Sequence, residues 1–213
     1  MTSVAPAETP VEGTGGCGAR VAAGPLVVDL DGTLVTIDTA LLCAIVLCRR
    51  PLRLLRGLAA WRRGRAGVKQ ELAASAALDA ARLPYHAGLL AYLRDERAAG
   101  RKLLLATGAD RRIAAAVAEH LALFDAVLAS DGRTNLTGRA KLAAIRRTIG
   151  DGPFCYVGNS RADLAVWRAA ARGICVNTRP RVAREAAGAT LVERSFPAEE
   201  GRLGRWLRAI RRR

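Results

Sequence analysis

The sequence predicts an α/β fold, with a mostly parallel sheet covered by helices on both faces and an all-helical cap inserted after the first strand. Half of its 213 residues are hydrophobic (51%), which is enough to bury a core and excludes a disordered basic chain. Short apolar segments alternate with helical patterns over most of the chain, as in strands joined by crossover helices. One stretch, residues 38–85, has no convincing strand pattern and predicts the cap.

The elements of this fold are expected in a simple order. Residues 1–24 have no signal-peptide pattern and are expected to form a flexible leader. The first strand is expected over residues 25–30, and a helix over residues 87–99, closed by Gly100, leads into a second strand over residues 101–107. The remaining elements are strands at 126–129, 154–157, 174–176 and 190–192, and helices near 110–121, 141–149, 162–171 and 181–187.

This order divides the chain into parts. The core is expected to comprise residues 25–37 and 86–197, with the cap at 38–85 between its two pieces. Residues 198–213 are expected to form a basic amphipathic helix at the C-terminus. Ligands of parallel sheets bind where the strands end at their carboxyl edges, so the residues that follow each strand are the candidates for a site.

The strongest motif is Val-Asp-Leu-Asp-Gly-Thr-Leu, which begins at Val28 and closes the first strand. It places two carboxylates, those of Asp29 and Asp31, at one edge of the sheet. Gly32 lets the chain turn sharply and leaves backbone amides free to meet an anion. One carboxylate can attack phosphorus and the other can give and take a proton. A lone Asp-x-Asp is more often a turn or a helix cap, but seven residues in this context favour catalysis.

Three further segments follow expected strands or precede an expected helix. Thr107 and Gly108 offer a hydroxyl and an amide to phosphate oxygens, although such a threonine is more often a helix cap. Lys141 can neutralise charge on a transferring phosphoryl group, although such a lysine is more often a solvated surface residue. Asn159 and Asp163 bring oxygen ligands that suit Mg²⁺.

In this order the motifs resemble those of the haloacid dehalogenase (HAD) superfamily of phosphohydrolases, and the resemblance covers residues 25–195. It implies a Rossmann-like core and a Mg²⁺-dependent phosphatase with Asp29 as nucleophile and Asp31 as general acid and base. It also implies phosphate contacts from Thr107 and Lys141. The metal would be held by Asp29, the backbone carbonyl of Asp31 and the fourth motif, and the cap would select the substrate.

One position departs from the superfamily pattern. The fourth motif usually begins Gly-Asp, but here Asn159 follows Gly158. An amide oxygen can coordinate a metal but brings no charge, so we expect a weaker metal affinity, with Asp163 carrying more of the site. The alternative to a phosphatase is a weakly active or non-catalytic domain that binds a phosphorylated ligand or a membrane prenyltransferase.

A narrower resemblance concerns the HAD-like domain that is fused ahead of UbiA-like polyprenyltransferases. It rests on the first motif continued as Val-Thr-Ile-Asp-Thr-Ala-Leu-Leu, on a basic helical cap, and on Tyr-Val-Gly-Asn-Ser-Arg-Ala-Asp from Tyr156. This likeness implies a lipid-linked or isoprenoid substrate, while a small soluble phosphate ester remains the alternative. Both a stand-alone relative and a part of such a fusion stay open.

The charge of the chain is strongly basic, with 34 Lys and Arg against 19 Asp and Glu, a net +15. Seven arginines lie in Arg49–Arg65 of the expected cap and six lie in Arg202–Arg213. Arginines around an apolar face suit an anionic membrane surface, whereas a solvated cap and a tail helix docked on the core are the alternatives. Nucleic acid is not the expected partner, because no helix-turn-helix, zinc or base-stacking motif occurs.

The expected compartment is the cytoplasm, with peripheral contact to the inner face of the membrane. Five cysteines without a Cys-x-x-Cys pair favour neither a disulfide framework nor a zinc site. The longest apolar run, Ala40–Cys48, has nine residues, whereas a spanning helix needs about 20. We therefore expect no membrane-spanning segment.

Overall fold

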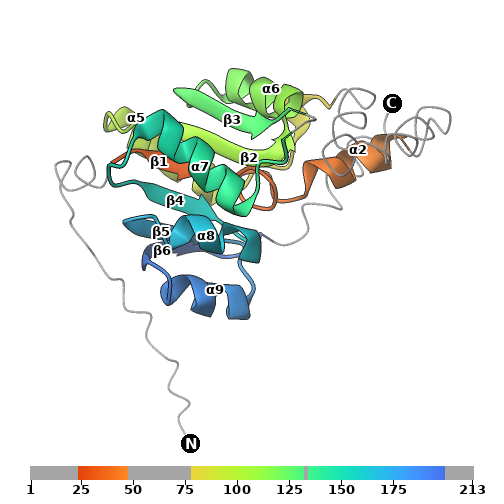
Figure 1. Ribbon diagram of the computed structural model, residues 1–213. Helices are drawn as coiled ribbons and strands as arrows, with labels where there is room; N and C mark the ends of the chain where they lie inside the picture. The colour runs from red at the N-terminus through yellow and green to blue at the C-terminus, as the bar shows by residue number, and fades with distance from the viewer. Residues whose placement is uncertain (1–23, 48–77, 132–133, 200–213) are drawn as a thin grey trace, which may run out of the picture.

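The computed structural model describes residues 24–47, 78–131 and 134–199. The strands of these residues form a six-stranded sheet in the order β3-β2-β1-β4-β5-β6, and every neighbouring pair is parallel (Figure 1). The α/β fold expected from the sequence is confirmed. The strands are β1 (Leu26–Val28), β2 (Leu103–Asp110), β3 (Ala126–Ser130), β4 (Cys155–Gly158), β5 (Arg172–Val176) and β6 (Leu191–Phe196).

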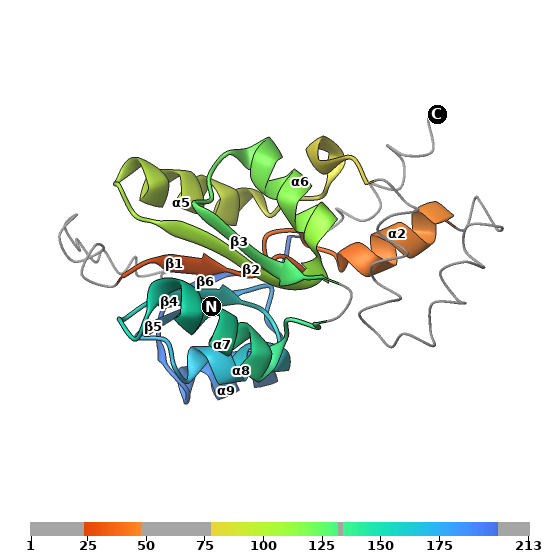
Figure 2. The same ribbon diagram turned by 45° about the horizontal axis from the view of Figure 1, so that its top comes forward.

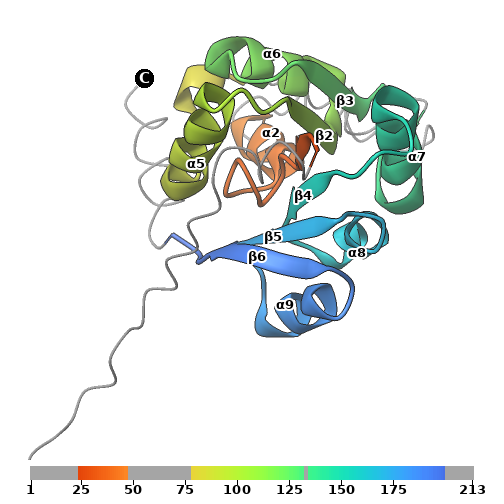
Figure 3. The same cartoon turned by 90° about the vertical axis from the view of Figure 1, so that its left-hand side faces the viewer.

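Helices cover both faces of the sheet, as Figure 2 shows most clearly. One face carries α5 (Ala87–Ala98) and α6 (Arg111–Leu121). The opposite face carries α7 (Gly138–Ile149), α8 (Leu164–Trp167) and α9 (Pro180–Ala187) (Figure 3). Each layer closes its own apolar cluster against the sheet, so the fold has two hydrophobic cores with the strands between them.

The central strand β1 shows why its residues form a strand. Leu26 and Val28 enter the core on the α5 face, whereas Val27 enters the core on the α7 face, and all three are fully buried. A strand buried on both sides reads as an unbroken apolar run, because successive side chains point to opposite faces. Burial of three branched side chains anchors the start of the first motif.

The strand order reverses beside β1. From β1 the chain builds β2 and β3 on one side, and it then returns to build β4, β5 and β6 on the other side. A doubly wound sheet leaves a crevice at such a reversal, outside the carboxyl ends of the two central strands. The first motif follows β1 and the fourth motif follows β4, so both lie at this crevice.

A short neck joins the sheet to the expected cap. We define the neck as Leu34–Thr36 together with Pro84–His86, which run antiparallel to each other. Two backbone hydrogen bonds of 2.9 Å join its halves, one donated by the N–H of Thr36 and one by the N–H of His86. The chain therefore leaves the core and returns to it at one place.

Part of the expected cap follows the neck within the described residues. It comprises α2 (Thr39–Leu47) and the 3-10 helix η2 (Ala80–Arg82). The arginine-rich segments predicted at Arg49–Arg65 and Arg202–Arg213 lie outside the described residues, as does nearly all of the leader at 1–24. Among the helices that the structure describes, none combines the length and apolar character needed to cross a bilayer.

Candidate active site

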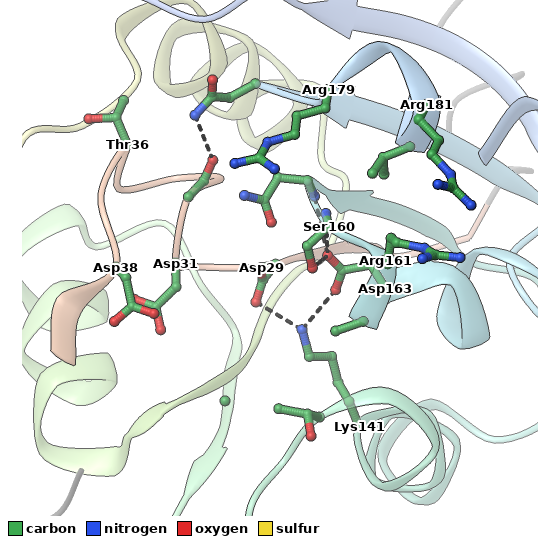
Figure 4. A pocket seen from close by; sticks show the side chains of 17 residues that line it. Asp29, Asp31, Thr36, Asp38, Lys141, Ser160, Arg161, Asp163, Arg179 and Arg181 are labelled. Atoms are coloured by element: carbon green, nitrogen blue, oxygen red, sulfur yellow. Dashed lines mark hydrogen bonds and ion pairs between the residues drawn. The ribbon is translucent and has the colours of Figure 1, made fainter. Parts of the chain in front are cut away.

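A cleft of about 890 Å³ lies at the reversal of strand order. Figure 4 looks into it and shows side chains from α7 and from the loops after β1, β4 and β5 converging on one space. Its lining contains most of the residues that the sequence singled out: Asp29, Asp31, Gly32, Gly108, Lys141, Asn159 and Asp163. The strands are parallel, so segments that are distant in the sequence meet at the carboxyl edge of the sheet.

Asp29 lies at the floor of the cleft, one residue beyond β1. Its backbone N–H donates to the carbonyl of Val157 over 3.0 Å, which continues the pairing of β1 with β4 and fixes the residue in place. Its side chain is only 8% exposed. Lys141 Nζ lies 2.8 Å from Asp29 Oδ1, and the Thr33 hydroxyl lies 3.4 Å from Oδ2.

Lys141 is the cation of this floor, and it comes from the first turn of α7. It is 4% exposed, so the structure does not place it among solvated surface lysines. Its Nζ donates to Asp29 Oδ1 over 2.8 Å, to the Tyr156 hydroxyl over 2.8 Å and to Asp163 Oδ1 over 3.1 Å. One ammonium therefore holds two carboxylates that follow different strands, β1 and β4.

Asp163 organises the loop after β4. Its Oδ1 accepts a hydrogen bond of 2.6 Å from the Tyr156 hydroxyl in addition to that from Lys141. Its Oδ2 accepts from the backbone N–H groups of Asn159 and Ser160, over 3.2 and 3.0 Å, and from the Ser160 hydroxyl over 2.9 Å. Both oxygens are thus engaged within the protein, and they shape the fourth motif into a tight turn at η3 (Arg161–Asp163).

The electrostatics of the floor follow from burial and charge. Burial, with help from the charge of Asp163, raises the pKa of Asp29 to about 7 against the opposing effect of Lys141. Burial alone would raise the pKa of Asp163 too, but Lys141 and the donated hydrogen bonds outweigh it and lower that pKa. Burial disfavours the charged lysine, yet the two carboxylates outweigh that effect and raise the pKa of Lys141. Lys141 is therefore a permanent cation.

Asp31 lies beside the floor and is tied to the cap. Its Oδ1 accepts a hydrogen bond of 2.8 Å from the backbone N–H of Thr39, the first residue of α2. In Figure 4 its carboxylate points toward Asp38 and not toward Lys141. The two aspartates of the first motif thus have different surroundings: Asp29 is buried against a lysine, and Asp31 faces the cleft at the start of the cap.

Gly32 allows the first motif to approach the fourth. Its φ of +72° is in the left-handed region, and a Cβ there would run into the amide of Asn159. The same loop is held from the other side by Asn177, whose Nδ2 donates to the carbonyl of Gly32 over 3.4 Å. Only glycine combines this backbone angle with such close contact.

Substitution of Gly32 by alanine tests whether the close approach of this residue to Asn159 stabilises the protein. Gly32→Ala is expected to lower the free energy of unfolding by about 2 kcal/mol, because the strain of a positive φ is joined by displacement of the Asn159 side-chain amide. Gly100→Ala is the matched control, since Gly100 has a φ of +82° but no atom within 4 Å of the point where a Cβ would lie, and we expect it to cost about 1 kcal/mol. Urea unfolding measures both. Equal losses in the two variants would show that the contact with Asn159 is unimportant.

Thr107 and Gly108 are adjacent in the sequence but have different surroundings in the structure. Gly108 lines the cleft, and its carbonyl accepts from the Ser130 hydroxyl over 3.0 Å. The Thr107 side chain is fully buried, and its hydroxyl accepts from the N–H of Ala109 over 3.0 Å, as in a local cap. The hydroxyl is therefore not among the groups that line the cleft, and its contact with phosphate stays a prediction.

The oxygen groups at the floor can be compared with the ligands that Mg²⁺ prefers. In the part of the chain that the structure describes, no three Asp, Glu, His or Cys side chains form a metal cluster. Asp29, Asp31, Asn159 and Asp163, the four residues expected to hold the metal, all line the cleft, and the carboxylates of Asp29 and Asp163 also accept hydrogen bonds from the protein. Mg²⁺ uses one or two carboxylates and keeps several waters. This mixed oxygen set therefore fits Mg²⁺, and the direct part of Asp163 in holding the metal stays a prediction.

Several residues of the site were not expected from the sequence. Tyr156 joins Lys141 to Asp163, but in the sequence it looks like one more apolar residue of a buried strand. The lining also includes Ser160, Arg161, Asn177, Arg179 and Arg181. The carboxyl-edge rule could have found the last three, because they follow β5.

Comparisons with known proteins agree with this architecture. The chain is 38% identical over 155 residues to the uncharacterized protein y4nM of Sinorhizobium fredii, covering 71% of this chain and 30% of that protein. It therefore spans less than a third of the length of this relative. A protein of unknown function from Bordetella pertussis Tohama I has a TM-score of 0.61 at 19% identity, covering 79% of this chain and 96% of that one. A phosphoserine phosphatase in apo form has a TM-score of 0.56 at 17% identity, covering 87% and 98%.

The doubly wound sheet, with a cleft of charged groups at its strand reversal, defines an α/β protein of the parallel-sheet class. Residues 26–168 match the family of haloacid dehalogenase-like hydrolases. The chain belongs to that family. It shares its fold with the solved phosphoserine phosphatase.

Proposed function

We propose that this protein is a Mg²⁺-dependent phosphatase that hydrolyses a phosphate monoester through an aspartyl phosphate on Asp29. The observation that carries the proposal is the pairing of a buried carboxylate with a buried ammonium at the floor of the cleft, 2.8 Å apart. The lysine gives the carboxylate a nearby positive charge that also suits a phosphoryl group. A phosphoserine phosphatase of the same fold has been solved as an analogue of its phospho-aspartyl intermediate.

The proposed reaction has two displacements at phosphorus. First, an oxygen of Asp29 forms a bond to phosphorus, the ester bond breaks, and Asp31 gives its proton to the leaving alcohol. Asp31 then takes a proton from water, whose oxygen attacks the phosphorus of the acyl phosphate and releases Asp29 and inorganic phosphate. Lys141 keeps Asp29 oriented and neutralises charge on the phosphoryl oxygens throughout.

Bound Mg²⁺ would supply positive charge to the transferring phosphoryl group, and the Asp29 carboxylate, the Asp31 backbone carbonyl and the side-chain oxygens of Asn159 and Asp163 would hold it. The protein's own part is to keep these oxygens in place. Asp163 does so through the N–H groups of the fourth motif, and Gly32 does so by letting the first motif touch Asn159.

The test is a search for the intermediate itself. The protein is incubated with p-nitrophenyl phosphate and Mg²⁺, quenched in acid and digested. The mass of the peptide that contains Asp29 is then measured by mass spectrometry. We expect release of p-nitrophenol and a peptide heavier by one phosphoryl group. Turnover without Mg²⁺, or a phosphoryl group on another residue, would contradict the proposal.

Asn159 supports a second candidate, a weakly active domain that binds a phosphorylated ligand, because it brings no charge to the metal. Asn159→Asp is expected to lower the Mg²⁺ concentration for half-maximal activity by about tenfold. It is also expected to destabilise the metal-free protein, since it adds a carboxylate beside Asp29 and Asp163. Mg²⁺ titrations and thermal unfolding measure the two effects. An unchanged Mg²⁺ requirement would mean that Asn159 does not face the metal.

The substrate proposed from the sequence is a lipid-linked or isoprenoid phosphate, presented at an anionic membrane or by a prenyltransferase partner in the cytoplasm. Its support is the likeness of the motifs and the arginine-rich segments at 49–65 and 202–213. Polyprenyl phosphates should therefore be assayed beside small phosphate esters. The preferred ester identifies the substrate class.

A further inference from the structure

One side of the cleft is lined by guanidinium groups. Arg161 lies in the turn after β4, and Arg179 and Arg181 lie at the start of α9. Figure 4 shows the Arg179 side chain extending over the cleft from the loop after β5, on the side away from Lys141. The proposed chemistry at Asp29 uses Lys141 and a metal, and it uses none of these arginines.

The charge of this group is incompletely compensated. Glu185 on α9 accepts from Arg161 and from Arg181, each over 3.1 Å, so that one carboxylate serves two guanidinium groups. Arg179 has no carboxylate within 4.0 Å among residues 24–47, 78–131 and 134–199. Three cations and one anion leave two positive charges at this side of the cleft.

The backbone fixes Arg179 against the first motif. Asn177, two residues earlier, has a φ of 51° and holds the carbonyl of Gly32 through its amide. Pro180, one residue later, occupies the first turn of α9 and sets the direction of that helix. Arg179 is thus the helix N-cap, and its backbone is held on both sides while its side chain is exposed. The loop is fixed, and the guanidinium is free to meet a ligand.

We infer that the substrate carries a second phosphoryl group, and that Arg179 binds it while the first phosphoryl group lies at Asp29, with Arg161 and Arg181 adding positive charge to the same side of the cleft. This inference rests on the proposed function. Guanidinium groups bind phosphate oxygens in pairs of parallel hydrogen bonds. Two uncompensated positive charges match the charge of one phosphate. The substrate class is therefore a bisphosphate or diphosphate ester, with one group hydrolysed and the other retained as a handle.

The test compares ligands with one and two phosphonate groups. Alkylene diphosphonates of increasing chain length and the matching alkyl monophosphonates compete with p-nitrophenyl phosphate at a fixed concentration of free Mg²⁺. At the best chain length we expect the diphosphonate to inhibit at least about tenfold more tightly than its monophosphonate. Arg179→Gln is expected to remove most of that ratio.

Arg184→Gln is the matched control, because Arg184 is an exposed arginine of the same helix that does not line the cleft. It is expected to keep the wild-type ratio. If no diphosphonate exceeds its monophosphonate, or if both variants lower the ratio equally, the inference is wrong. Calorimetric titration of the same ligands into the Mg²⁺-loaded protein gives the ratio without turnover. A protein that prefers diphosphonates but hydrolyses nothing would refute the phosphatase and leave the second site standing.

Discussion

Asp29→Asn is expected to abolish phosphatase activity, with kcat falling by at least about 10³-fold, because the amide cannot form an acyl phosphate. Asp151→Asn is the control, since Asp151 is exposed and does not line the cleft. Initial rates on p-nitrophenyl phosphate with Mg²⁺ measure both variants. If Asp29→Asn keeps a tenth of the wild-type kcat, Asp29 is not the nucleophile.

The same variant is expected to stabilise the metal-free protein at neutral and higher pH. The pKa of Asp29 is about 7 in the folded chain, against an ordinary value of 3.8. Between these values the folded state binds one proton more than the unfolded state, so stability falls as the pH rises through this window. Asparagine has no proton to lose, while Lys141 keeps Asp163 as its partner. The Tm of Asp29→Asn should exceed that of the wild type by a few degrees at pH 8 and by little at pH 4.

Lys141→Met is expected to have the second large effect. It leaves two buried carboxylates, Asp29 and Asp163, without the ammonium that lies between them. Loss of one member of a buried ionic group costs about 3–5 kcal/mol, and we expect kcat to fall by about 10³-fold. Lys102→Met is the control, because Lys102 is an exposed lysine outside the cleft. Urea unfolding and initial rates separate the two losses.

A double variant identifies the cause. If repulsion between the carboxylates causes the instability, Lys141→Met with Asp163→Asn should recover part of the lost unfolding free energy and none of the activity. If the lost packing of the lysine stem causes it, the second substitution should add a further loss. Stability that is unchanged in Lys141→Met alone would show that the ammonium does not hold the floor together.

The sequence predicted the candidate site best where the reactive residues directly follow a strand. Asp29 and Asp31 directly follow a buried apolar run, so the rule that places ligands at carboxyl ends locates them without further information. Lys141 was a weaker prediction, because a lysine at a helix start is usually solvated. Its burial depends on the packing of α7 against β2, β3 and α8, which brings its ammonium to Asp29 and Tyr156 and which no local pattern encodes.

Other features depended on tertiary contacts. Tyr156 has the same apolar neighbours as any strand residue, and its role arises only where its hydroxyl meets Lys141 and Asp163. The last strand was expected over residues 190–192, whereas β6 runs over Leu191–Phe196. It contains Glu193, Arg194 and Ser195, which an exposed edge strand tolerates and an apolar search overlooks.

The neck has a consequence for how this fold changes. The hydrogen bonds between Leu34–Thr36 and Pro84–His86 hold the two ends of the inserted segment, residues 37–83, side by side. The entropy of closing such an insert grows only with the logarithm of its length. Segments of very different size and composition can therefore be exchanged at this junction while Asp29 and Lys141 stay where they are.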